Sequence, residues 1–229
     1  MAEKRVFYSE AAYVLGVILL GLGTALMEKA DLGVSMVVAP AYLIYRAVSR
    51  IYPFFTFGMA EYSFQAFLLI ALSVALRRGR KSYLFSFVTA VIYGCALDLF
   101  MRLIAGVPTD TLGWRLLYYF TGLVICSAGV ACYFHTYVTP AAYELTVKEI
   151  SEAYGFRIDK VKTIYDLCSC FAGVVLSFLF FGFGHFEGVK FGTLFCALVN
   201  GWLIGRIGAW MERTFRFEDR WALREMFSK

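Results

Sequence analysis

Acidic side chains inside an apolar chain are the residues of this sequence most able to do chemistry. Of its 229 residues, 60% are hydrophobic and only 17% are charged, and the mean hydropathy is +0.67. A charged side chain in a bilayer costs at least about 2.5 kcal/mol on insertion scales, and it usually faces an interior cavity. The acids in or beside apolar stretches are therefore candidates to bind a solute, a cation or a proton: Glu28, Asp31, Glu61, Asp98, Glu144 and Asp166.

Three further polar residues border two breaks in the apolar pattern. Residues 28–35 interrupt an apolar stretch that resumes in MVVAPAYLIY, and HTYVTP, which begins at His135, interrupts a second one. Ser35 and Thr139 are typical helix N-cap residues, and Pro140 suits the first turn of a helix. The imidazole of His135 could relay protons near neutral pH, although a lone His near a membrane surface is more often structural.

These residues together form the predicted binding site around the two breaks: Glu28, Asp31, Ser35, Asp98, His135, Thr139, Glu144 and Asp166. Asp98 has a structural alternative, because Arg102 lies one turn later on the same helical face and could pair with it. Several acids with few buried bases favour a cation or coupled protons, whereas helix N-termini at Ser35 and Thr139 favour an anion. A zwitterion or a proton-coupled anion satisfies both, so the class of ligand stays open.

Six apolar stretches are long enough to cross a bilayer, which takes about 20 residues of helix. Short alternating strands, the signature of a closed barrel, are not seen in the sequence, so helices are expected. The fold class is thus an all-α membrane protein, with a single helical domain over residues 1–229. The predicted spans cover residues 11–27, 54–76, 83–104, 116–134, 164–182 and 189–211.

Lysine and arginine are distributed unevenly over the predicted loops, and this distribution sets the orientation. With the N-terminus in the cytoplasm, 16 of the 22 basic residues fall inside, among them those of the RRGRK turn at 77–81. Both termini are therefore expected in the cytoplasm, in a multi-pass protein of the inner membrane. The tail at 212–229 interleaves aromatic and charged residues, which favours an amphipathic interfacial helix. The net charge of +5 then reflects topology and not nucleic-acid binding.

The order of features repeats along the chain with a shift of about 106 residues. The segment from Gly23 matches the segment from Gly129, and Glu61 matches Asp166. Each half, about 11–105 and about 116–211, contains three spans. Because three is odd, the halves cross the membrane in opposite senses, an arrangement common among secondary transporters. The amphipathic segment after each break then either re-enters the membrane or lies on its surface, and the sequence leaves both open.

Three features resemble bacterial integral membrane proteins of the YczE/YyaS/YitT-like group: the A-D-L-G-V-S motif at 30–35, the internal duplication, and FGTLFCALVNGWLIGRIGAW at 191–210. The resemblance covers most of the chain and implies a shared fold. Members of that group usually follow L-G-V-S with Pro, an aromatic residue and Asp, where this chain has Met-Val-Val at 36–38. Their Gly-three-residues-Asp pattern is intact in the first half, at Gly94 and Asp98, and lost in the second.

Catalytic motifs are not visible in the sequence, which has no HExxH, P-loop or GxSxG pattern. The six cysteines lack the spacing of a metal site, so no enzyme activity, metal or cofactor is expected. The leading hypothesis is a small-solute transporter that contacts membrane lipids and binds a small molecule or ion at the two breaks. The alternatives are a substrate-capturing subunit of an ATPase-driven importer and a non-transporting scaffold or regulator. A homodimer, or a complex with a partner membrane protein, fits all three.

Overall fold

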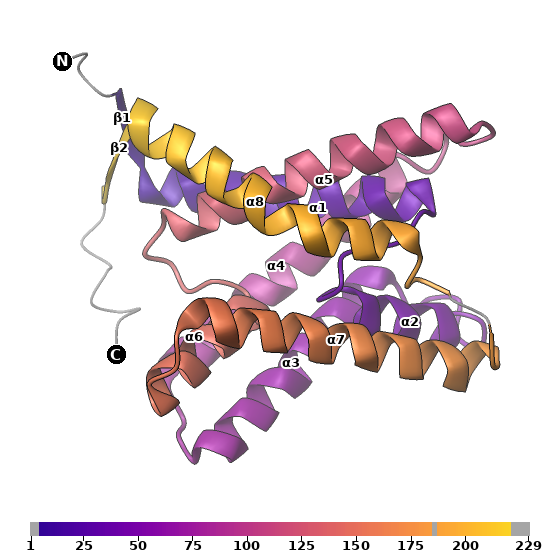
Figure 1. Ribbon diagram of the computed structural model, residues 1–229, viewed down its shortest axis with the longest axis horizontal. Coiled ribbons are helices and arrows are strands. Elements are labelled where there is room, and N and C mark those ends of the chain that lie inside the picture. Colours follow the sequence, from indigo (N-terminus) through magenta and orange to yellow (C-terminus); the bar gives the residue numbers. More distant parts are fainter. Residues whose placement is uncertain (1–4, 185–186, 221–229) are drawn as a thin grey trace.

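Eight helices and two short strands form the part of the chain that the computed structural model describes, residues 5–184 and 187–220 (Figure 1). Six of the helices are long and apolar enough to cross a membrane, and they coincide with the six predicted spans. The chain is therefore a multi-pass helical membrane protein, as predicted. The elements in order are β1 (Arg5–Tyr8), α1 (Ser9–Ala30), α2 (Ala39–Val48), α3 (Phe57–Leu76), α4 (Lys81–Leu103), α5 (Leu112–Phe134), α6 (Ala142–Tyr154), α7 (Ile158–Phe181), α8 (Phe191–Thr214) and β2 (Phe215–Glu218).

The helices begin and end a few residues away from the predicted bounds. Hydropathy locates a span only roughly, whereas capping hydrogen bonds determine its first and last residues. The Thr56 hydroxyl accepts a hydrogen bond from a backbone N–H in the first turn of α3, and Thr111 does the same for α5. Asp31 ends α1 in the left-handed conformation, with φ of 50°, which a short polar side chain tolerates.

Helices α1 and α5 form the centre of the molecule and pack against each other more extensively than any other pair. A methyl group on Gly16 would lie 3.2 Å from the carbonyl oxygen of Gly129, and one on Gly23 would lie 2.7 Å from that of Gly122. These four glycines let the two backbones touch, as small residues do at helix interfaces in membranes. Helix α4 packs against α1, and α8 packs against α5.

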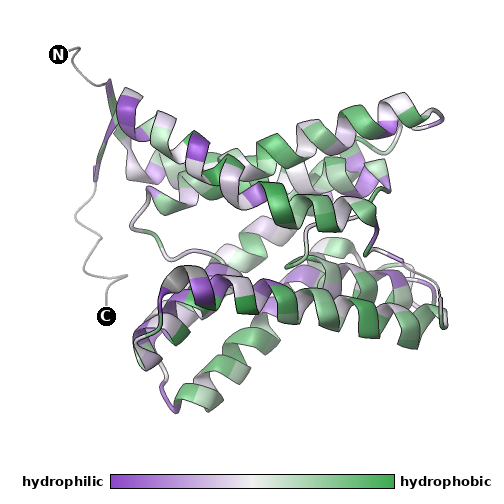
Figure 2. Ribbon diagram, viewed as in Figure 1, coloured by the Kyte–Doolittle hydropathy of each residue, from purple (hydrophilic) through white to green (hydrophobic). Residues whose placement is uncertain are grey.

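Two further pairs flank this centre, since α2 packs against α7 and α6 against α3. Helix α3 also lies close to α4, where a methyl group on Gly58 would collide with the carbonyl oxygen of Gly94. By contrast, α7 and α8 make little contact with each other, and they are the least buried of the six long helices. Figure 2 shows hydrophobic residues along the long helices and hydrophilic residues mainly toward their ends.

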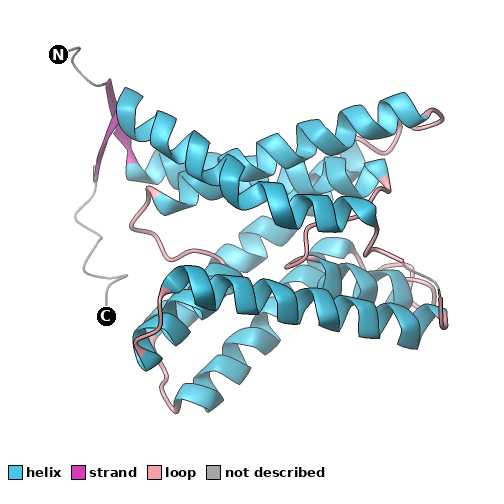
Figure 3. Ribbon diagram, in the orientation of Figure 1, coloured by secondary structure: helices cyan, strands magenta, loops and turns pink. Residues whose placement is uncertain are grey.

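The two ends of the chain meet in a parallel two-stranded sheet, β1 beside β2, at one end of the helix bundle (Figure 3). The ring of Phe7 packs against those of Phe215 and Phe217, with centroids 5.3 and 5.8 Å away. The helix predicted for 212–229 is therefore wrong over β2, whose sequence FRFE alternates aromatic and charged residues with the period of a strand. Residues 221–229 lie outside the described part of the chain.

In the variants Gly79→Cys and Gly106→Cys, the new thiols are expected to react with a maleimide from opposite faces of the membrane. The six long helices alternate in direction, so the α3–α4 turn lies at the end of the bundle with the termini and the α4–α5 connection at the other (Figure 1). A β-carbon would meet no atom within 4 Å at either glycine, so both substitutions leave the packing unchanged. The measurement is labelling with a membrane-impermeant maleimide before and after permeabilisation, with the parent chain as control for its native cysteines. Labelling of both positions from one face would contradict this topology.

Gly23→Ala is expected to destabilise the protein, whereas Gly205→Ala is expected to leave its stability unchanged. A β-carbon at Gly23 would lie 2.6 Å from Sγ of Cys126 and 2.7 Å from its backbone nitrogen, whereas one at Gly205 would meet nothing within 4 Å. Overpacking of this kind costs about 1–3 kcal/mol. Thermal unfolding of the two purified variants in detergent provides the comparison, and equal midpoints would show that α1 and α5 are not held at this distance.

Candidate functional site

A cavity of about 360 Å³ lies between the two chain breaks, and residues from both halves of the chain line it. Its walls come from α1, α5 and α8, from one residue each of α3 and α4, from the turn at 35–38, and from the N-terminal parts of α6 and α7. A concave, mostly apolar space with a few converging polar groups is the usual form of a small-molecule site. The polar lining includes Ser35, Gln65, Tyr133, Tyr143, Glu144, Lys162, Asp166 and Asn200.

The turn after α1 brings residues 35–38 into the cavity wall. Gly33 has a φ of 118°, a conformation that glycine adopts readily, and the backbone N–H of Val34 bonds to a carbonyl of the α7–α8 connection at 3.2 Å. The carbonyl oxygen of Ser35 accepts hydrogen bonds from the N–H groups of Val38 and Ala39, at 3.1 and 2.9 Å. Helix α2 has no side-chain cap, so the predicted capping by Ser35 is wrong, and Ser35 borders the cavity instead.

The second break ends where α3 caps α6. Oε1 of Gln65 on α3 accepts a hydrogen bond from the N–H of Ala142, the first residue of α6, at 3.0 Å. The predicted cap by Thr139, with Pro140 in the first turn, is wrong because both residues precede the helix. Their carbonyl oxygens accept hydrogen bonds from two hydroxyl groups of α4, at 3.1 and 2.8 Å. This anchoring places Glu144 in the first turn of α6, at the cavity.

A second carboxyl group lies directly behind the cavity wall. Glu61 on α3 is completely buried, with 0% of its surface exposed. The Tyr143 hydroxyl donates a hydrogen bond to its Oε2 at 2.9 Å, and Nε2 of Gln65 donates to the same atom at 3.2 Å. Since Tyr143 and Gln65 both line the cavity, Glu61 is separated from it by a single layer of side chains.

An ion pair supplies the positive charge of the site. Lys162 and Asp166, one turn apart on α7, are 2.6 Å apart, and both line the cavity. With Glu144 also ionised, the cavity carries one excess negative charge. In the sequence, Lys162 counts among the 16 basic residues expected on the cytoplasmic side, because a lysine beside a predicted span is normally a topology signal.

Three buried side-chain atoms in the described part of the chain lack a hydrogen-bond partner, and all three belong to this site: Oε1 of Glu61, the hydroxyl of Tyr133 and Oε2 of Glu144. Tyr133 and Glu144 line the cavity itself. An unpaired buried polar atom costs about 1–3 kcal/mol. Buried polar atoms in proteins are usually satisfied by a protein group, ordered water or a bound ion.

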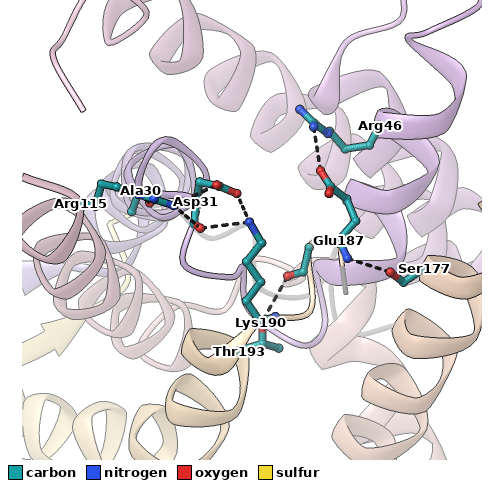
Figure 4. A network of polar contacts seen from close by, with 9 residues as sticks. Ala30, Asp31, Arg46, Arg115, Ser177, Glu187, Lys190 and Thr193 are labelled. Carbon is teal, nitrogen blue, oxygen red and sulfur yellow. Dashed lines mark hydrogen bonds and ion pairs between the residues drawn. The ribbon is translucent and has the colours of Figure 1, made fainter. Parts of the chain in front are cut away.

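Asp31 and Glu28 lie at the C-terminal end of α1, outside the cavity, and Figure 4 shows the polar network that contains Asp31. Asp31 pairs with Arg115 of α5 at 2.9 Å and with Lys190 next to α8, so it ties together the ends of three long helices. Arg46 of α2 pairs with Glu187 at 2.7 Å in the same region. Glu28 lies beside this network, where packed side chains leave no cavity.

Asp98 holds the start of α3. Its Oδ2 accepts the Thr56 hydroxyl at 2.6 Å, and its Oδ1 accepts the N–H of Gly58 at 2.8 Å. A carboxylate at a helix N-terminus is stabilised by the helix dipole. Asp98 therefore has a structural role, as the alternative interpretation predicts. Its partner is the start of α3, however, and no ion pair with Arg102 forms among the described residues.

The remaining two predicted residues also lie away from the cavity. His135 has its Nδ1 2.7 Å from the carbonyl oxygen of Ala131, and its ring stacks on Phe217 of β2 with centroids 4.3 Å apart. Its Nε2 lies 3.4 Å from a carboxylate oxygen of Glu212. These contacts anchor the paired termini. Thr139 is buried against α4.

The structure therefore brings together three of the eight predicted site residues, Ser35, Glu144 and Asp166, and leaves the other five outside the cavity. Of the polar lining residues named above, sequence reasoning missed five: Gln65, Tyr133, Tyr143, Lys162 and Asn200. Tyrosines in apolar spans usually serve as bulk, and a lysine beside a span is usually a topology signal. One available signal was the spacing of Glu61 and Gln65, which share a helical face. Among the described residues, no three His, Cys, Asp or Glu side chains converge to hold a metal ion.

Glu144→Gln is expected to weaken the pH dependence of stability. Burial raises the pKa of Glu144 above its ordinary 4.5, Lys162 opposes this, and Asp166 adds to it. A raised folded-state pKa gives stability that is complete below the unfolded value and is lost as the pH rises through the folded value. Thermal midpoints from pH 4.5 upward should therefore fall less for Glu144→Gln than for the parent. Parallel curves for the two proteins would contradict this assignment.

The comparisons with known proteins identify the chain at the level of its family. A family model described as "Family of unknown function (DUF6198)" matches residues 7–208, which include the cavity and five complete long helices. No curated protein and no solved structure matches the chain. Because the match covers most of the sequence, the chain belongs to the DUF6198 family.

Proposed function

We propose that this protein is a membrane carrier that binds a small polar solute in the central cavity. The observation that carries the proposal is a pair of unpaired buried polar atoms at the cavity, on Tyr133 and Glu144, with a third on Glu61 behind its wall. A scaffold has no need to keep such atoms unpaired in its interior, because each one costs stability. A solute with hydrogen-bond donors would satisfy the two that line the cavity, on Tyr133 and Glu144. The volume of about 360 Å³ suits a small metabolite.

The carrier is built from two inverted repeats, and the glycine contacts at its centre support this. Gly122 and Gly129 follow Gly16 and Gly23 by 106 residues each. Gly16 touches Gly129 while Gly23 touches Gly122, which is the reciprocal pattern that a twofold axis produces. The packing of α4 on α1 has its counterpart in α8 on α5, and α2 on α7 has its counterpart in α6 on α3.

The two halves differ in one contact, and this difference supports alternating access. Gly94 packs against Gly58 between α3 and α4, whereas its counterpart Gly201 meets nothing within 4 Å. Helices α3 and α4 are therefore closely packed, whereas their counterparts α7 and α8 stand apart beside the same cavity. Carriers with inverted repeats expose a central site to either side by moving one repeat against the other. Closing α7 on α8 while α3 parts from α4 would move the opening to the other face of the membrane.

The orientation and depth of the protein complete the proposal. The excess of basic residues on one side favours cytoplasmic termini in the inner membrane, even with Lys162 assigned to the cavity. The turn at 35–38 and the segment before α6 would then approach the cavity from opposite faces. Backbone that is not helical is tolerated at depth where it lines a cavity. We also propose that the chain shares its fold with the YczE/YyaS/YitT-like group, which it resembles in sequence.

The solute we favour carries an amino group, as a cation or as a zwitterion. Glu144 has no ion-pair partner among the described residues, while Lys162 is held by Asp166. An ammonium group is the natural counter-ion for a carboxylate in these surroundings, with the Tyr133 hydroxyl as a further partner. A carboxylate on the same solute could compete for Lys162.

Glu144→Gln and Tyr133→Phe are expected to weaken solute binding by about tenfold or more. A hydrogen bond to a charged group contributes about 1.5–3 kcal/mol, and 1.4 kcal/mol is a factor of ten in affinity. The probe is a panel of amines, amino acids and carboxylates, screened by thermal shift on the purified full-length protein. Calorimetry of the hits with both variants follows, and Glu152→Gln, an exposed acid on the same helix, is the matched control. A panel without hits, or hits that bind all variants alike, would refute the site.

A substrate-capturing subunit is the second candidate, and the exposed faces of α7 and α8 favour it because they offer a docking surface for a partner. Proteoliposomes that contain only this protein separate the two candidates. A carrier takes up the solute without a partner, whereas a capturing subunit binds the solute and transports none.

A further inference from the structure

Glu61 is a buried acid whose surroundings differ from those of a structural ion pair. Its Oε2 is held by two neutral donors, Tyr143 and Gln65, and its Oε1 is buried with no partner. Glu149, on α6, provides the contrast. It is only 5% exposed, yet Arg80 binds it at 2.7 Å and the Tyr83 hydroxyl donates to its other oxygen at 3.2 Å.

No basic side chain balances the Glu61 carboxyl among the described residues. The titratable groups that face it are Tyr143 and Glu144 from α6, Tyr93 from α4 and Tyr165 from α7. None of these is a base, and the one acid among them, Glu144, repels a charge on Glu61. A buried carboxylate is normally retained only with a cationic partner, because desolvation otherwise favours its neutral form.

A role limited to packing does not require a carboxylic acid at this position. A glutamine would accept the hydrogen bond from Tyr143 with its oxygen and would fill the same volume. What the carboxyl adds is the capacity to gain and lose a proton, and its unpaired Oε1 is the atom left free for that proton.

We propose that Glu61 is the proton-binding site of the carrier, and that the protein exchanges this proton for its solute. The inference rests on the proposed carrier function. In the solute-free state, Glu61 takes a proton from cavity water on Oε1 and becomes a neutral carboxylic acid. A cationic group that binds at Glu144 favours the ionised form of Glu61, so the proton returns to the water as the solute enters. Because such coupling is reciprocal, a proton on Glu61 weakens solute binding by the same factor.

The test uses dicyclohexylcarbodiimide, which adds to protonated carboxyl groups in apolar surroundings, on the purified full-length protein in lipid nanodiscs. Peptide mass spectrometry should locate the adduct at Glu61. Labelling should fall as the pH is raised from about 5 to about 9, and at the high end it should fall about tenfold for each pH unit. Glu149 is the matched control, because this buried glutamate is paired with Arg80 at 2.7 Å and should remain unlabelled. An adduct on Glu149 and none on Glu61 would overturn the proposal.

Infrared difference spectra over the same titration need no reagent. Because Glu144 also titrates, the comparison is made without it: Glu144→Gln should show a carboxyl band that disappears with rising pH, and the double variant Glu61→Gln/Glu144→Gln should lack that band. If no titrating band depends on Glu61, the proposal fails. Because the adduct is located in the parent chain, the labelling test holds even if Glu61→Gln does not fold. Neither measurement uses a solute, so their failure leaves the carrier proposal standing, and a failed solute screen leaves the proton site standing.

Discussion

The close approach of α1 and α5 is the constraint on which the rest of the structure depends. In a bilayer, helices gain little from burying apolar surface, so small residues that let backbones touch decide where they associate. Gly16 and Gly23 face Gly129 and Gly122, and any side chain there would push the two helices apart. Helices α4 and α8 pack onto this central pair, and the cavity lies beside it, between the chain breaks that follow α1 and α5.

Much of the fold could be predicted from the sequence, because the bilayer imposes simple rules on composition and length. The six spans follow from runs of apolar residues, and the two short helices follow from segments too polar to cross. The end of the chain differs from its prediction. The composition of FRFE favours an interfacial helix, but its alternation of aromatic and charged residues suits the strand that pairs with β1. Strand pairing between residues about 210 apart leaves no local signal in the sequence.

The candidate site was less predictable, because an acid in an apolar stretch has several possible structural roles. Asp98 caps a helix, and Asp31 ties three helix ends together through two basic residues. Only the positions of partners distant in the sequence separate these roles from ligand binding. The same limit applies to Glu144, whose exposure to the cavity depends on the Gln65 cap that fixes where α6 begins. Hydropathy identifies the candidate acids, and tertiary packing decides which of them lack partners.

The central claim is that unpaired polar atoms around the cavity exist to meet a ligand. Its most direct test is an experimental structure of the protein in lipid nanodiscs, at a resolution that shows ordered solvent. The account predicts density that is not protein within hydrogen-bond distance of the Tyr133 hydroxyl and of Oε2 of Glu144. A closed, dry interior in which these two groups bond to other side chains would contradict it.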